Sequence, residues 1–188
     1  MAGGMLDGRE LKFFCPGGSS TPLLPASAAD TAYTFEAIQE AGSLLGTGAL
    51  MIYSDQTSVV SVVRRFTEFY EHESCGKCTP CRECSLWLRQ IYGRIEAGMG
   101  RDDNLDLLLD LCDNIFGRVF CALGDGMTSP IVSSLKYFRD EYDQHLREGR
   151  CPLGTTEPRR DIEVTHFTPR RVAEHPPVPA TTAPAGQA

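Results

Sequence analysis

The sequence predicts an α+β protein made of a small N-terminal sheet module, a four-helix bundle and a disordered C-terminal tail. Three observations predict this order. Short apolar runs separated by Gly- and Pro-rich turns occupy residues 1–56, as in strands joined by tight connections. Apolar residues recur with helical spacing through residues 57–150. Residues 151–188 change character again and end in Pro, Ala and Thr.

The N-terminal module contains two predicted strands and one predicted helix. The strands cover residues 11–15 and 50–53, and the second is apolar throughout, so we expect it to be buried. Residues 16–20, Pro-Gly-Gly-Ser-Ser, predict a turn, because glycine tolerates positive φ. A phosphate-binding loop is the weaker alternative, because the lysine and the following helix of such a loop are missing. A short helix is predicted over residues 34–41 and ended by Gly42. Two strands do not make a stable sheet, so the other strands are expected to be missing or to lie on a partner.

Four helices are predicted in the bundle, each started by a capping residue or a proline and ended by a glycine or a turn. The predicted starts are Ser58, Pro80, Asp102 or Asp103, and Thr128 or Ser129 followed by Pro130. The second helix is predicted to run to about Ala97, and the fourth to Gly149. Residues expected to face inward on the second and third helices are Leu86, Trp87, Ile91, Ile95, Leu105, Leu108, Leu109, Cys112, Ile115 and Phe116.

The tail is predicted to be disordered. Seven of the twelve prolines fall in residues 152–188, and such a segment cannot bury enough apolar surface to offset the entropy of ordering it. A solvated extension is favoured over a partner-binding tail.

Composition and charge exclude several classes of function. The net charge of -7 argues against nucleic acid as a main partner. No apolar run reaches the roughly 18 residues that a membrane-spanning helix needs, and no leader opens the chain. Any membrane association is therefore expected to come through another protein. Eight cysteines without a leader indicate a reducing cytosol and thiolates held by metal rather than disulfides.

Four of these cysteines crowd into one short stretch: Cys75, Cys78, Cys81 and Cys84, each three residues after the last. Thiolates are soft ligands, and repeated C-x2-C steps let a short loop wrap one metal centre. Three such steps favour a cubane iron–sulfur cluster, because zinc sites usually take pairs of cysteines from two separated knuckles. In ferredoxin-type loops the cluster is completed by a remote cysteine.

Cys121 is the preferred fourth ligand, since a distant sulfur encloses the cluster and links two parts of the bundle. Cys84 stays open as an alternative, because it lies one helical turn after Cys81. Cys112 falls on the apolar stripe of the third helix and is expected to be a core thiol. Cys151, the third remote candidate, borders the tail, and Cys15 ends a predicted strand; neither has an expected function.

Charged groups and a glycine flank the predicted cluster loop. Lys77 and Arg82 place positive charge beside an anionic cluster, and Gly76 permits close backbone approach. For both cations, simple solvation at the surface is an equally good interpretation. No nucleophile–base pair is recognisable, since neither His72 nor His145 stands in a hydrolase motif. We therefore predict no catalytic residue in this chain.

Several motifs together resemble the NADH-binding flavoprotein component of respiratory complex I, the F subunit of bacterial NADH-quinone oxidoreductase. They are Glu-Ser-Cys-Gly-Lys-Cys-Thr-Pro-Cys-Arg at 73–82, Phe-Cys-Ala-Leu-Gly-Asp at 120–125, Ser-Pro-Ile at 129–131 and Tyr-Phe-Arg-Asp-Glu-Tyr at 137–142. The resemblance spans about residues 1–151. It implies a 4Fe-4S cluster on Cys75, Cys78, Cys81 and Cys121, and a β-grasp module of the soluble-ligand-binding type in residues 1–56. Diaphorase subunits of NAD-linked formate dehydrogenase and hydrogenase share this motif.

Two departures from the family pattern qualify the resemblance. Members commonly carry Gly where this chain has Cys84. The flavin and NADH sites of the family lie in a preceding Rossmann-like domain that matches nothing here, and the β-grasp module begins midway. The chain is thus expected to be the C-terminal portion of such a subunit, as a fragment, a split gene or a misplaced start. FMN and NADH are implied for the complete subunit, and the chain alone is predicted to be inactive toward NADH.

The resemblance implies a place in the peripheral arm of the complex. Its partners would be the other subunits of that arm and the flavin- and NADH-binding half, with no nucleic acid and no direct membrane insertion. Its location would be cytoplasmic and peripheral, on the cytoplasmic face of the inner membrane through the complex. Two other hypotheses remain: a structural zinc or assembly module on Cys75, Cys78, Cys81 and Cys84, and a truncation product that folds poorly.

Overall fold

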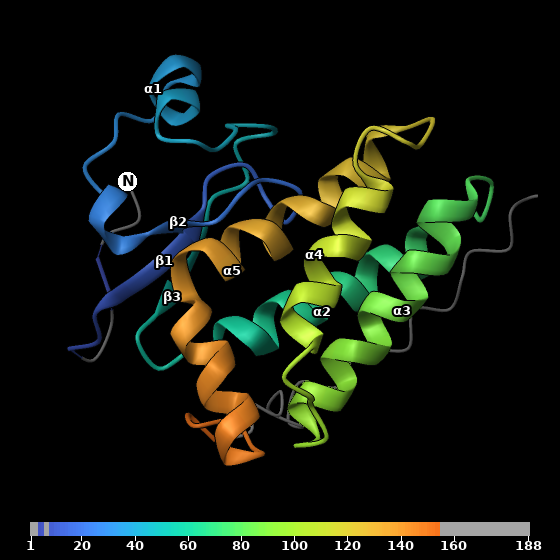
Figure 1. Cartoon of the computed structure of the whole chain (residues 1–188). Coiled ribbons are helices and arrows are strands. Elements are labelled where there is room, and N and C mark those ends of the chain that lie inside the picture. Colours follow the sequence, from blue (N-terminus) through green and yellow to red (C-terminus); the bar gives the residue numbers. More distant parts are fainter. Residues whose placement is uncertain (1–3, 6–7, 155–188) are drawn as a thin grey trace, which may run out of the picture. The chain divides into compact units, whose positions relative to one another are not determined.

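A three-stranded antiparallel sheet forms the N-terminal part of the computed structural model, which describes residues 4–5 and 8–154 (Figure 1). The central strand is β1 (Leu11–Cys15), flanked by β2 (Leu24–Pro25) and β3 (Met51–Ser54). Phe14 is the register partner of Leu24 on one side and of Ile52 on the other. The strand predicted over residues 11–15 is confirmed, whereas β2 is too short to show in the sequence pattern.

The expectation that the second predicted strand is buried is wrong. Ile52 of β3 is 37% exposed, and Met51 and Tyr53 are only partly buried. Within the described part of the chain β3 pairs with β1 only, so it is an edge strand of the sheet. An apolar run therefore marked an edge strand here and not a central one.

Two short helical turns follow the sheet's first strands. They are a 3-10 turn, η1 (Ala26–Ala28), and a helix, α1 (Phe35–Glu40). Thr34 caps α1 by accepting the Ala37 N–H at 3.3 Å, and Gly42 leaves the helix with φ of +86°. The predicted helix and its terminating glycine are confirmed.

The rest of the described chain is helical. The four helices are α2 (Val59–Glu73), α3 (Thr79–Glu96), α4 (Asn104–Ile115) and α5 (Ala122–Glu148). Helix α2 packs on α3 and α5, and α4 also packs on α3 and α5. Ser58 caps α2 by accepting the Ser61 N–H at 3.2 Å, and Gly149 ends α5 with φ of +60°, as the sequence predicts.

Sheet and helices share one apolar core. Phe13 of β1 stacks on Tyr53 with ring centroids 4.5 Å apart, and its ring also lies 5.6 Å from that of Phe138 on α5. Lys12, the neighbour of Phe13, forms a salt bridge with Glu141 of α5, whose other carboxylate oxygen accepts the Val59 N–H at 2.8 Å. Helix α5 therefore joins the sheet to the start of α2.

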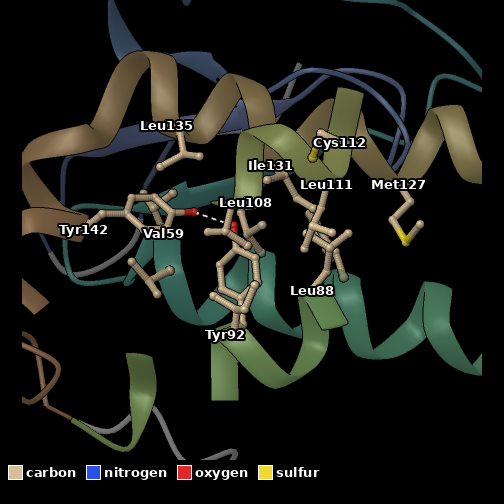
Figure 2. Packing of buried hydrophobic residues seen from close by; sticks show 14 of the residues in the cluster. Val59, Leu88, Tyr92, Leu108, Leu111, Cys112, Met127, Ile131, Leu135 and Tyr142 are labelled. Atoms are coloured by element: carbon tan, nitrogen blue, oxygen red, sulfur yellow. Dashed lines mark hydrogen bonds between the residues drawn. The ribbon is translucent and has the colours of Figure 1, made fainter. Parts of the chain in front are cut away.

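Two tyrosine hydroxyls lie in the interior of the helical part (Figure 2). The hydroxyls of Tyr92 on α3 and Tyr142 on α5 lie 2.9 Å apart, and Ser134 Oγ lies 2.8 Å from the Tyr142 hydroxyl. Each buried hydroxyl thus has a partner, which avoids the cost of an unpaired polar group. Burial raises the pKa of both tyrosines, so the network stays protonated at neutral pH.

Two residues predicted to face inward are exposed. Trp87 is 47% exposed, while its neighbour Leu88 is fully buried together with Tyr92. Helix α3 packs on α2, α4 and α5, and Trp87 lies outside the stripe of α3 residues that these contacts bury. Phe116 is 63% exposed because α4 ends at Ile115 and the chain leaves the helix there.

The predicted start of the last helix is also wrong. Helix α5 begins at Ala122, with Cys121 as its N-cap, and Pro130 lies inside it. Proline removes one backbone donor, and Pro130 is buried, so packing offsets the lost hydrogen bond. The departure from helical geometry comes later, at Phe138, where φ is −133° and ψ is 28°.

No helix within the described residues is both long and apolar enough to cross a membrane.

Candidate metal centre

The predicted cluster loop connects α2 to α3. Helix α2 ends at Glu73, with Ser74 as its C-cap, and Gly76 turns the chain with φ of +75°, a conformation that favours glycine. Cys78 is the N-cap of α3, so Cys81 lies in the first turn of that helix. The loop therefore presents its three cysteines at the point where one helix ends and the next begins.

Cys121 comes from a separate segment. It is the N-cap of α5 and follows the connection from α4. The structure brings it to the loop: Cys75, Cys78, Cys81 and Cys121 all line one cavity of about 100 Å³. The cavity walls also include the apolar side chains of Val119 and Leu123. The four cysteines that the sequence prefers as ligands therefore line the same cavity.

The cavity fits a group of several atoms. A single buried water needs only about 10–15 Å³, so about 100 Å³ exceeds what one small ion fills. Four thiols and apolar walls suit soft metals and sulfide. Among residues 4–5 and 8–154, no three His, Cys, Asp or Glu side chains converge as ligands of a single ion. The four cysteines that line the cavity would hold the cluster.

Two of the cysteine sulfurs take part in hydrogen bonds. The Phe120 N–H donates to Cys78 Sγ at 3.4 Å, and Ser74 Oγ lies 3.4 Å from Cys81 Sγ. Such donors compensate negative charge on a thiolate. Sequence reasoning missed both. A serine directly before the first cysteine of the loop was the available signal for Ser74, whereas a backbone donor leaves no trace in residue type.

Cys84 lies apart from the cavity. It is buried within α3 as part of the apolar core and is not among the residues that line the site. Burial first, and then the nearby carboxylates of Asp110 and Glu83 and the thiol of Cys81, raise the pKa of the Cys84 thiol. A raised pKa opposes the thiolate form that binds metal. The arrangement favours Cys121 over Cys84 as the fourth ligand.

The remaining cysteines are buried. Cys112 lies in the core beside α5, as predicted, and burial raises the pKa of its thiol to about 12. Burial also raises the pKa of Cys15 on β1 to about 12. Cys151 is buried just beyond α5. All three thiols lie outside the cavity lining.

The two cations beside the loop differ in role. Lys77 lines the cavity, which fits the predicted placement of positive charge near a cluster. Arg82 turns back to the loop: its Nη1 donates to the Gly76 carbonyl at 2.7 Å, and its Nε contacts Glu83 at 2.9 Å. His72 is largely exposed and lies near Glu73 at 3.8 Å, outside the cavity lining.

Thiol alkylation of the metal-free chain should follow this arrangement. At about pH 8, iodoacetamide is expected to modify the exposed Cys75 and Cys121 first. Cys15 and Cys112 should react only after unfolding, because only a thiolate is a good nucleophile and both pKa values are near 12. Peptide mass spectrometry over time measures the order. Labelling of Cys112 as fast as that of Cys75 would contradict the buried placement.

Comparison with known proteins finds a family model and several relatives that match the part of the chain that carries this site. Residues 61–145 match the family described as the NADH-ubiquinone oxidoreductase-F iron-sulfur binding region. The chain is 56% identical over 152 residues to the NADH-quinone oxidoreductase F subunit of Mycobacterium tuberculosis, covering 81% of this chain and 34% of that protein. It is 44% identical over 134 residues to the mitochondrial 51 kDa subunit of NADH-ubiquinone oxidoreductase in Neurospora crassa. That match covers 71% of this chain and 27% of the Neurospora protein. The chain thus spans about a third of the length of these relatives.

A solved structure shares the fold. The NAD+-reducing [NiFe]-hydrogenase in its air-oxidised state superposes with a TM-score of 0.65 at 27% identity, over 73% of this chain and 24% of that chain. The α+β class is therefore found in an experimental structure of a related sequence.

Proposed function

Residues 61–145 belong to the iron–sulfur binding region that characterises the F subunits of NADH-quinone oxidoreductases, and from this premise we propose that the chain is an electron-transfer module. Its cysteines Cys75, Cys78, Cys81 and Cys121 hold a 4Fe-4S cluster. When bound, the cluster takes up and releases single electrons. The observation that supports the proposal is that four cysteines from two segments distant in sequence line one cavity.

The chain's own residues position and shield this site. The loop between α2 and α3 supplies three sulfurs, and the N-cap of α5 supplies the fourth. Val119 and Leu123 keep one wall apolar, and Lys77 offsets negative charge. Pairwise packing of α2 to α5 holds the two sulfur-bearing segments together. We assign these helices to a four-helix bundle (57–150), residues 1–56 to a partial β-grasp module and residues 151–188 to a tail; positions 155–188 of that tail lie outside the described residues.

The wider assembly follows from the same proposal. In a complete subunit, electrons would pass from NADH through FMN in a flavin-binding half to this cluster, and then to other subunits of the peripheral arm. The module would lie at the cytoplasmic face of the membrane through that complex. A diaphorase role in a hydrogenase is the second candidate, supported by the likeness to the NAD+-reducing hydrogenase.

Anaerobic purification of the chain, followed by reconstitution with iron and sulfide, tests the proposal. We expect about four iron and four sulfide per chain, brown colour and an electron paramagnetic resonance signal on reduction. NADH–ferricyanide activity is expected to be absent without a flavin-binding partner. A colourless chain that carries one zinc would contradict the cluster. NADH–ferricyanide activity of this chain with bound FMN would contradict the proposal that the flavin site lies in a separate flavin-binding half.

A further inference from the structure

A ring of hydrogen bonds connects Ser74 to one of the four cavity cysteines. Ser74 Oγ lies 3.4 Å from Cys81 Sγ, and it accepts the Gly76 N–H, also at 3.4 Å. Gly76 is held by Arg82, whose Nη1 donates to the Gly76 carbonyl at 2.7 Å. Arg82 directly follows Cys81 on α3, so the ring closes between the end of α2 and the first turn of α3. Ser74 also lines the cavity itself.

The direction of the contact between Ser74 and Cys81 follows from the chemistry of ligation. In the free chain either the hydroxyl or the thiol can donate the proton. A cysteine that binds metal does so as a thiolate, which has no proton to give. Ser74 is then the donor. The Gly76 N–H already occupies a lone pair of the Ser74 oxygen, which polarises the hydroxyl and leaves its proton for sulfur.

We propose that Ser74 sets part of the reduction potential of this site by donating a hydrogen bond to Cys81. The inference rests on the proposed cluster. Adding an electron increases negative charge on the ligand sulfurs, and a donor stabilises the reduced state more than the oxidised state. Ser74 thereby raises the potential. Gly76 and Arg82 are positioning residues, because Gly76 donates to the Ser74 oxygen and Arg82 holds the Gly76 carbonyl.

Cys78 offers an internal comparison. Its sulfur accepts the Phe120 N–H at 3.4 Å, from the segment that carries Cys121. That donor is part of the backbone and does not depend on the loop serine. Ser74 is therefore a side-chain donor whose removal leaves the Cys78 hydrogen bond and all four thiols in place.

A redox titration of the reconstituted full-length chain, followed by electron paramagnetic resonance, tests the inference. Ser74→Ala is expected to lower the midpoint potential while iron content stays that of the parent chain. Ser74→Thr keeps a hydroxyl, so its midpoint potential should stay close to that of the parent chain. Ser85→Ala is the matched control: Ser85 lies one turn after Cys81, is buried, and donates to the Arg82 carbonyl at 3.1 Å instead of to sulfur. The midpoint potential of the Ser85→Ala chain should equal that of the parent chain.

The outcomes separate this inference from the proposed function. A fully loaded Ser74→Ala chain with the parent potential would overturn the role of Ser74 and leave the cluster standing. A parent chain that never holds a cluster would overturn both. If Ser74→Ala loses the cluster, the pair Ser74→Thr and Ser74→Val replaces it, since the two differ by a hydroxyl against a methyl group. A lower potential for Val than for Thr supports the inference, and equal potentials overturn it.

Discussion

Replacing Cys121 with alanine is expected to abolish the cluster. The variant leaves three sulfurs on the loop and opens the cavity on the side of α5, where Cys121 is the N-cap. Loss of an outer partner of a metal ligand already costs roughly 10–100-fold in affinity, and loss of a ligand should cost more. Iron and sulfide assays with the visible spectrum after anaerobic reconstitution measure the effect.

Cys84→Ala is the control for this experiment, because it removes a thiol close to the loop in sequence that does not line the cavity. It should retain the cluster at the parent's iron content, with a modest loss of stability from the removed core atom. The reverse pattern, in which Cys84→Ala lacks the cluster and Cys121→Ala retains it, would contradict the proposal that Cys121 is the fourth ligand. A zinc site on the four clustered cysteines predicts that Cys121→Ala has no effect at all.

Gly98→Ala is expected to destabilise the fold by roughly 2–5 kcal/mol, from left-handed backbone strain and overpacking together. Gly98 follows α3 with φ of +71°, and an added Cβ would overlap the backbone carbonyl of Gly149, which ends α5. A backbone atom cannot move aside as the end of a flexible side chain can. Urea unfolding of the metal-free chain, followed by circular dichroism, gives the free energy of unfolding.

Gly42→Ala separates strain from overlap. Gly42 also has a positive φ, +86°, but nothing lies within 4 Å of an added Cβ. It should cost only about 1 kcal/mol, the backbone strain alone. An equal decrease in the free energy of unfolding for Gly98→Ala and Gly42→Ala would show that the contact between Gly98 and Gly149 does not limit the packing of α3 and α5.

Local sequence patterns were sufficient to predict an element where a residue type acts through its own backbone or its nearest neighbours. The apolar run at 11–15 became β1, Ser58 became the cap of α2, and Gly149 ended α5. Patterns failed where a distant element decides the environment. Trp87 fits a helical stripe, yet the positions of α2 and α4 leave it exposed, and Pro130 fits a helix start, yet buried packing carries α5 through it.

For the candidate site, the sequence by itself determined the chemistry: the C-x2-C spacing specifies soft sulfur ligands on a short loop, because loop reach depends on local covalent geometry. Only the tertiary structure decided which further cysteine lies at the same cavity. It places Cys121 at the cavity and Cys84 in the core, because packing of α3, α4 and α5 fixes where these segments lie. It also revealed the hydrogen bonds that join Ser74 to Cys81 and Phe120 to Cys78, since hydrogen bonds to sulfur depend on distances that no residue spacing encodes.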